Sequence, residues 1–187
     1  MDWIKQIEKY VPTNIQEERD KILILKYIER YQDILTRENE LLHMTSSAFV
    51  VNESFDKVLM AYHNIYDSWA WLGGHCDGNE NLLEVALKEV KEESGLEEII
   101  PVENGIFSIE MLPVLGHIKK ENYISSHIHI STTFLIQGKE GSPIRPKKDE
   151  NKAVKWIEIN DIESYCSEMH MMPIYKKIRE KINKHYK

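Results

Sequence analysis

The chain has 187 residues, of which 42% are hydrophobic and 29% are charged, and its formal net charge is −7. This length fits one domain with a short accessory segment, and the composition excludes a disordered or fibrous chain. The negative charge disfavours binding to a nucleic acid polymer or to an anionic membrane.

No apolar run in the sequence approaches the roughly 20 residues of a membrane span. The segment from Met1 to Lys5 also lacks the basic and then apolar pattern of a secretory signal. Cys76 and Cys166 are far apart and form no Cys-x-x-Cys pair, which argues against a disulfide framework and against a cysteine zinc site. We therefore expect a cytoplasmic protein that does not contact a membrane.

Residues 1–42 are predicted to form an N-terminal helical extension. Apolar residues recur at helical spacing from Trp3 to Val11 and again from Ile22 to Leu35, with Pro12 between the two helices. The apolar stripe of the second helix is expected to pack on the main domain or on a second subunit. The extension is therefore expected to form a lid or a homodimer surface, and the sequence favours neither.

The remainder, residues 43–187, is predicted to form the main domain. The expected strands span residues 47–51, 57–62, 69–72, 106–116, 127–137 and 153–159. A helix over about 80–94, ended by Gly95 as a left-handed cap, separates the first three strands from the last three. Residues 138–152, rich in glycine, proline, lysine and arginine, are predicted to form a mobile basic loop, and further helices close the chain. This order predicts an α/β fold with a mixed sheet covered by helices.

Most of the negative charge lies in one segment, because residues 77–98 hold eight acidic residues against two lysines, a balance of −6. Helical spacing places Glu89, Glu92 and Glu93 on one narrow face. Like charges at this spacing repel, and the helix dipole disfavours anions in the last turn. A solvated acidic face is one interpretation. Converging carboxylates also suit a hard divalent cation, above all Mg²⁺, and we favour this metal site.

The same segment resembles the Nudix box, G-x5-E-x7-R-E-U-x-E-E-x-G-U, in which U is aliphatic. Its matching positions are Gly74, Glu80, Glu89, Val90, Glu92, Glu93, Gly95 and Leu96, with Lys88 in place of the arginine. The resemblance implies a Nudix-like α/β/α sandwich. It also implies a Mg²⁺-dependent or Mn²⁺-dependent hydrolase that cleaves a phosphoanhydride bond in a nucleoside-diphosphate-linked or related small diphosphate substrate.

The resemblance also implies roles for individual box residues. Glu89, Glu92 and Glu93 are expected to bind the metal, with a backbone carbonyl of Gly73 or Gly74 as a further ligand. Glu92 and Glu93 are also expected to take part in catalysis by activating a water molecule. Gly73, Glu80, Lys88 and Gly95 are expected to be structural. The ammonium of Lys88 replaces the planar arginine contact only as a point charge, which we expect to change the rate without abolishing activity.

Outside the box, Glu150 stands where a later loop supplies a ligand or a general base in several Nudix subfamilies, although a solvated loop acid is equally compatible with the sequence. Arg145 and Lys147 are candidates for contacting substrate phosphates, and a solvent-exposed role is the alternative. His127 and His129 alternate on one face of a strand and form half of a metal site at most, because no third ligand is evident. We expect them to be ordinary strand residues that line the substrate cleft.

Two other functions remain open on the same scaffold. One is a sensor that binds a nucleotide or sugar nucleotide without cleaving it, and the other is a diphosphate isomerase. The sensor is disfavoured because all the box glutamates are present. The isomerase would rearrange its substrate without releasing phosphate. The sequence does not identify the diphosphate substrate.

Overall fold

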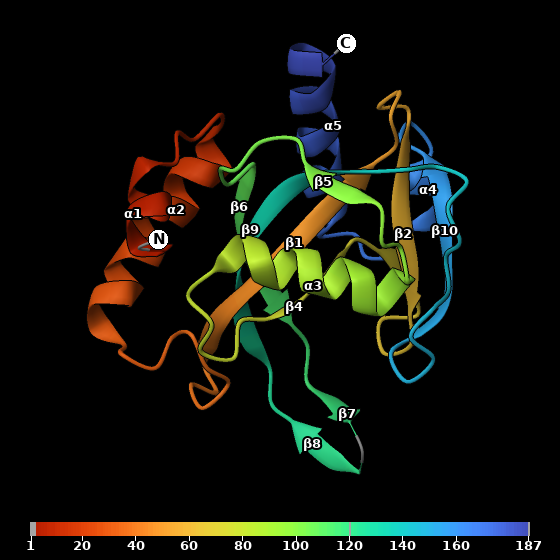
Figure 1. Ribbon diagram of the computed structural model, residues 1–187. Coiled ribbons are helices and arrows are strands. Elements are labelled where there is room, and N and C mark those ends of the chain that lie inside the picture. Colours follow the sequence, from red (N-terminus) through yellow and green to blue (C-terminus); the bar gives the residue numbers. More distant parts are fainter. Residues whose placement is uncertain (1–2, 120, 187) are drawn as a thin grey trace. The chain divides into compact units, whose positions relative to one another are not determined.

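The computed structural model describes residues 3–119 and 121–186 (Figure 1). Met1 and Asp2, which belong to the segment inspected for a secretory signal, lie outside the described residues. The helices are α1 (Trp3–Lys9), α2 (Ile15–Arg30), α3 (Leu82–Ser94), α4 (Ile162–Tyr165) and α5 (Met172–Tyr186). Among the described residues, none of these helices combines the length and the apolar character needed to cross a membrane.

The strands are β1 (Leu42–Val51), β2 (Lys57–His63), β3 (Ser68–Ala70), β4 (Leu72–His75), β5 (Ile99–Pro101), β6 (Ser108–Val114), β7 (His117–Lys119), β8 (Asn122–Ile124), β9 (His127–Gly138) and β10 (Asn151–Glu158). All six predicted strands have a counterpart here, the run at 69–72 being divided between β3 and β4. The short strands β5, β7 and β8 lie in segments that the sequence pattern left without regular structure.

The chain divides into two compact units. The first comprises the residues up to Ser47 together with Gly73–Ala86 and Asn104–Phe134, and the second comprises Ala48–Leu72, Leu87–Glu103 and the chain from Leu135. In the first unit, β4 pairs with β1, and β6 pairs with β9 in an antiparallel register from Ser108↔Thr133 to Val114↔His127. The hairpin of β7 and β8 forms a separate two-stranded sheet.

Helix α2 packs on strand β6 of the first unit through polar side chains. Gln16 Nε2 donates to the carbonyl of Ile109, and the backbone N–H of Met111 donates to Asp20 Oδ2. The fully buried Glu17 accepts a hydrogen bond from Ser108 Oγ at 3.1 Å, which satisfies a carboxylate that would be costly to bury alone. Polar contacts therefore account for much of this docking.

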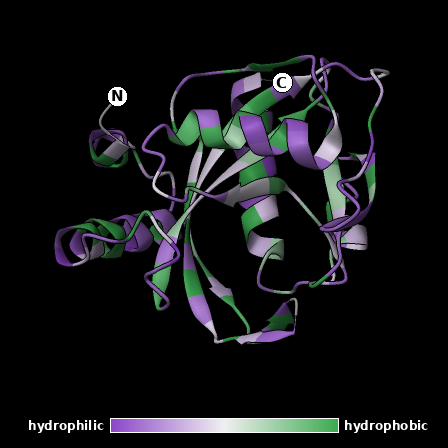
Figure 2. Ribbon diagram, turned by 60° about the horizontal axis from the view of Figure 1, so that its bottom comes forward, coloured by the Kyte–Doolittle hydropathy of each residue, from purple (hydrophilic) through white to green (hydrophobic). Residues whose placement is uncertain are grey.

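The apolar residues of the second helix differ in their exposure. The buried residues of α2 are Glu17 and Ile24, whereas Ile22 and Leu23 are exposed. The helix also ends at Arg30, so Ile34 is buried in the turn that follows instead of forming part of the helix. Figure 2 shows hydrophilic and hydrophobic residues mixed along the N-terminal helices.

The second unit is built on strands in the order β10-β2-β1-β9-β5. Phe49 of β1 faces Tyr175 of α5, with ring centroids 6.5 Å apart. The next residue, Val50, approaches Gly138 on the other face, where Leu96 also packs directly after α3. Successive strand residues point to opposite faces, so helical segments cover both faces of this part of the sheet. This double cover explains why the β1 residues of this unit, from Ala48 to Val51, are all buried.

Candidate active site

The second unit gathers four carboxylates around two lysines. Glu89, Glu92 and Glu93 lie in the last turns of α3, and Glu150 directly precedes β10. Lys88 Nζ lies 3.4 Å from Glu92 Oε1 and 3.7 Å from Glu89 Oε1. Lys147 Nζ lies 3.6 Å from Glu92 Oε2 and 3.2 Å from Glu150 Oε1. Lys147 thus connects the loop carboxylate to the helix, and we call these four glutamates the carboxylate cluster.

The loop before β10 reaches the cluster because it caps the C-terminal end of α3. The backbone N–H of Arg145 donates to the carbonyl of Ser94 at 2.7 Å, and that of Lys147 donates to the carbonyl of Glu93 at 3.2 Å. These bonds satisfy carbonyls that have no partner inside the helix. The prediction of a mobile loop over 138–152 is therefore wrong for this part, which is anchored by its backbone.

Gly95 allows the loop before β10 to pass close to the end of α3. It follows α3 with φ +68°, the left-handed conformation predicted for a helix cap, and its N–H donates to the carbonyl of Lys91. A Cβ at this position would lie 2.7 Å from Arg145 Cγ. The glycine therefore serves both the backbone conformation and the close passage of the loop.

Asn151 holds Glu93 in place and was not identified from the sequence. Glu93 is 5% exposed, and Asn151 Nδ2 donates a hydrogen bond of 3.2 Å to its Oε1. Asn151 is itself buried, and its backbone N–H bonds to the carbonyl of Lys147. The sequence provided little indication of this role, because an asparagine at the start of a strand is usually a turn residue.

Charge and burial act together on these side chains. Burial raises the pKa of Glu89, Lys88 opposes that increase, and the neighbouring Glu92 adds to it. Burial alone would lower the pKa of Lys147, but its hydrogen bond to Glu150 and the other carboxylates raise it, so the ammonium remains charged. When all are ionised, four carboxylates and two ammonium groups leave two negative charges within the cluster. A net charge of two negative units and a set of oxygen ligands fit one hard divalent cation.

The remaining box residues with predicted roles belong to the first unit. A Cβ on Gly73 would lie 2.7 Å from the Cα of Ser47 and 2.8 Å from the carbonyl oxygen of Ser46, so only glycine permits β4 to pass this close to β1. Gly74 follows it in β4. Glu80 is exposed and precedes the start of α3 at Leu82.

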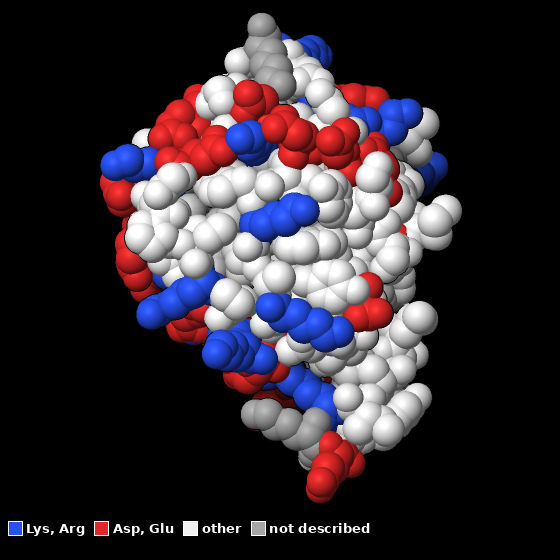
Figure 3. Space-filling view, turned by 90° about the vertical axis from the view of Figure 1, so that its right-hand side faces the viewer, with Lys and Arg blue, Asp and Glu red and all other residues white. Residues whose placement is uncertain are grey.

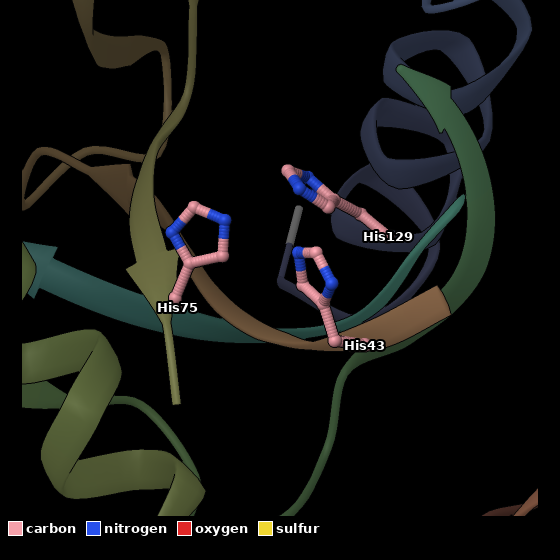
Figure 4. A group of neighbouring side chains, drawn as sticks. All are labelled: His43, His75 and His129. Carbon is pink, nitrogen blue, oxygen red and sulfur yellow. The ribbon is translucent and has the colours of Figure 1, made fainter. Parts of the chain in front are cut away.

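The first unit also brings histidines together, contrary to the expectation that His129 has no further ligands near it. The ring centroids of His43, His75 and His129 lie 5.0–5.1 Å from one another (Figure 4). His127 Nε2 lies 3.1 Å from His129 Nε2. The sequence showed the alternating pair on β9, but the other two rings come from β1 and β4, and no spacing connected them.

Burial favours the uncharged form of His43, His75 and His129. Burial lowers the pKa of His75 to about 3 and that of His129 to about 2, and it also lowers the pKa of His43. Among the described residues, these three side chains are arranged so that one ligand atom from each lies within 4.8 Å of the others.

Comparison with known proteins identifies the family. A family model described as NUDIX domain matches residues 41–178. A NUDIX-family hydrolase from Clostridium perfringens has a TM-score of 0.52 at 22% identity, covering 74% of this chain and 96% of that chain. An Ap4A hydrolase from C. elegans has a TM-score of 0.54 at 16% identity, covering 75% and 95%. A Nudix hydrolase from M. smegmatis has a TM-score of 0.53 at 13% identity, covering 76% and 87%.

The search of curated proteins found no match. At these identities the three structures show a shared fold, and the predicted Nudix-like α/β/α fold with a mixed sheet is confirmed. The family model covers most of the chain and includes the whole segment from Gly74 to Leu96. The chain therefore belongs to the Nudix family, and it is a pyrophosphohydrolase.

Proposed function

We propose that this chain hydrolyses a phosphoanhydride bond in a nucleoside-diphosphate-linked or related small diphosphate, with Mg²⁺ bound by Glu89, Glu92 and Glu93. The observation that carries the proposal is the carboxylate cluster, in which the loop glutamate Glu150 joins the helix glutamates through Lys147. When bound, Mg²⁺, or Mn²⁺ in its place, neutralises phosphate charge and lowers the pKa of a water molecule.

The protein residues have separate tasks in this proposal. Glu92 and Glu93 bind the metal and orient the water, and Asn151 fixes the carboxylate of Glu93 through its hydrogen bond. Glu150, which is partly exposed, accepts the proton of the attacking water as general base. Lys88, which is exposed, holds Glu89 and Glu92 in position through its ion pairs. Positioning and electrostatics then supply most of the rate enhancement.

Arg145 and Lys147 are the proposed phosphate contacts. The charged ammonium of Lys147 lies between Glu92 and Glu150. A phosphate oxygen of the substrate would replace one of these carboxylates as its partner. Arg145 lies over Gly95 at the end of α3, with its backbone fixed to the helix. Both residues therefore belong to the loop that also supplies Glu150, from which they would contact the substrate phosphates.

A small substrate fits the surface better than a nucleic acid polymer does. Figure 3 shows the side of β10, where Lys and Arg are scattered over a largely uncharged face and Asp and Glu gather mainly in a band near the top of the view. This face offers no continuous basic track for a phosphate backbone. One neighbour in fold is by its title an Ap4A hydrolase, so dinucleoside polyphosphates belong in the substrate panel beside sugar nucleotides, ADP-ribose and nucleoside triphosphates.

The test is a hydrolysis panel with the full chain, with Mg²⁺ and with excess chelator, followed by phosphorus NMR. The Glu92→Gln/Glu93→Gln variant is compared with Glu97→Gln/Glu98→Gln, whose carboxylates pair with Lys91 and Lys139 at the surface. We expect Mg²⁺-dependent cleavage by the wild type and the control, and a loss of at least about a thousandfold in the first variant.

Three outcomes would overturn the proposal. Equal activity of the two double variants would place the metal elsewhere. Tight nucleotide binding by folded protein without any cleavage would identify a sensor, and a rearranged product without phosphate release would identify an isomerase.

A further inference from the structure

We propose that His43, His75 and His129 bind a transition-metal ion, with Zn²⁺ as the representative ion. The three residues lie on β1, β4 and β9 of the first unit, and none belongs to the carboxylate cluster. Imidazole nitrogens suit zinc, copper, nickel and iron, whereas Mg²⁺ prefers oxygen ligands. The site therefore differs in chemistry from the one proposed for hydrolysis.

The three histidines are arranged much like the ligands of a metal-binding site. One ligand atom from each ring lies within 4.8 Å of the other two, and Figure 4 shows the three rings turned toward a common space. Nitrogens at the usual Zn–N distance of about 2.0–2.1 Å in a tetrahedral site lie about 3.4 Å apart. Modest rotations of side chains on fixed strands would close the remaining difference.

His43 gives an independent indication. Its Nδ1 lies 2.9 Å from the carbonyl oxygen of Asn39, so Nδ1 carries the proton and donates it, which leaves the lone pair on Nε2. His43 is only 4% exposed, and its Nε2 has no hydrogen-bond partner among the described residues. A buried acceptor without a partner is unfavourable. A ring held by a carbonyl on one nitrogen and open on the other is the usual arrangement of a metal-binding histidine.

His127 repeats the same arrangement beside His129. Its Nδ1 lies 2.8 Å from the carbonyl oxygen of Ser125, and its Nε2 lies 3.1 Å from His129 Nε2. With Nδ1 of His127 donating to Ser125, the Nε2 of His127 can accept a hydrogen bond from His129 Nε2, which would orient the His129 ring. We therefore assign His127 as a positioning residue for the site.

Packing alone does not explain the cluster. Among the described residues, the two carbonyl contacts and the His127–His129 contact involve four of the eight ring nitrogens of the four imidazoles, and the Nε2 of His43 is buried without a partner. Burial lowers the pKa of His43, His75 and His129, which favours the uncharged imidazole that binds metals. A cation at the centre would provide a partner for the Nε2 of His43 that lacks one.

The test uses the full chain without a histidine tag, freed of metal by chelation. Co²⁺ is the spectroscopic probe, since imidazole ligands give it visible absorption bands, and calorimetry measures Zn²⁺ binding. The variants are His75→Ala and His129→Ala, whose side chains are only partly buried, and His127→Ala. The control is His170→Ala, a histidine near Glu168 and outside the cluster. Circular dichroism of the metal-free proteins verifies that each one is folded.

We expect the wild type and His170→Ala to bind one Co²⁺ ion at the histidines, followed by its visible bands, with the same affinity. His75→Ala and His129→Ala should lose at least about a hundredfold in affinity, and His127→Ala about 10–100-fold. The Glu92→Gln/Glu93→Gln variant should keep the Co²⁺ bands, because its histidines are unchanged. This result would separate the histidine site from the site proposed for hydrolysis. Absence of uptake by folded wild type, uptake unaffected by His75→Ala and His129→Ala, or loss of the bands in the glutamate variant would overturn the inference. Should either alanine variant fail to fold, the corresponding glutamine variant gives the same readout.

Discussion

The carboxylate cluster and the histidine cluster are two polar groups built in opposite ways. The carboxylates come from one helix end and the loop that caps it, and two lysines offset part of their charge. The histidine cluster, His43, His75 and His129, comes from three strands, its pKa values are lowered by burial, and the Nε2 of His43 is buried without a partner among the described residues. Local sequence therefore specifies the first group, whereas only the pairing of distant strands produces the second.

The largest effect expected from a single substitution concerns Glu89, a mostly buried member of the carboxylate cluster. The Glu89 side chain is 12% exposed and lies near Lys88. Glu89→Gln keeps its shape but removes a charged metal ligand, so we expect Mg²⁺-dependent hydrolysis to fall about 10²–10³-fold. Steady-state kinetics measures this fall. Glu84→Gln, an exposed change on the same helix, is the matched control and should keep full activity. Equal rates for both variants would remove Glu89 from the site.

A smaller effect is expected from the residue that positions Glu93. Asn151→Ala removes the hydrogen bond to Glu93 Oε1, which should lower kcat about 10–100-fold through misplacement of that ligand. Lys152→Ala is the control, because the neighbouring Lys152 pairs with Asp67 at the surface. A purely structural role would lower the melting temperature of Asn151→Ala without changing kcat at temperatures where the variant is folded.

Because the loop before β10 packs closely on Gly95, we expect a side chain at that position to destabilise the protein. Gly95→Ala places a Cβ against Arg145 and forces a left-handed residue, so we expect a loss of about 1–3 kcal/mol in the free energy of unfolding. Gly105→Ala is the control, since a Cβ there meets no atom within 4 Å. Denaturant unfolding measures both. If the two variants are equally stable, the loop does not depend on this close approach.

The sequence predicted the features that depend on local spacing. Glu89, Glu92 and Glu93 follow from helical periodicity, and Gly95 follows from its position at the helix end. The anchoring of the loop was missed because it uses backbone N–H groups, which every residue except proline carries. The histidine cluster was missed for a different reason. Its members are separated by dozens of residues, so a single sequence gives no sign that β1, β4 and β9 bring them together.

The smallest expected effect tests the departure from the Nudix box. Lys88 Nζ lies 3.4 Å from Glu92 and 3.7 Å from Glu89, so a single charge already serves both carboxylates. Arginine would contact both through a planar fork, and we expect Lys88→Arg to raise kcat about twofold to fivefold. Lys88→Met, which removes the charge, should lower kcat by a similar factor, because exposed ion pairs contribute about 0.2–1 kcal/mol. Lys91→Met, which removes a contact with the surface residue Glu97, provides the control. A Lys88→Met variant with unchanged kcat would show that Lys147 alone supplies the positive charge that positions these carboxylates.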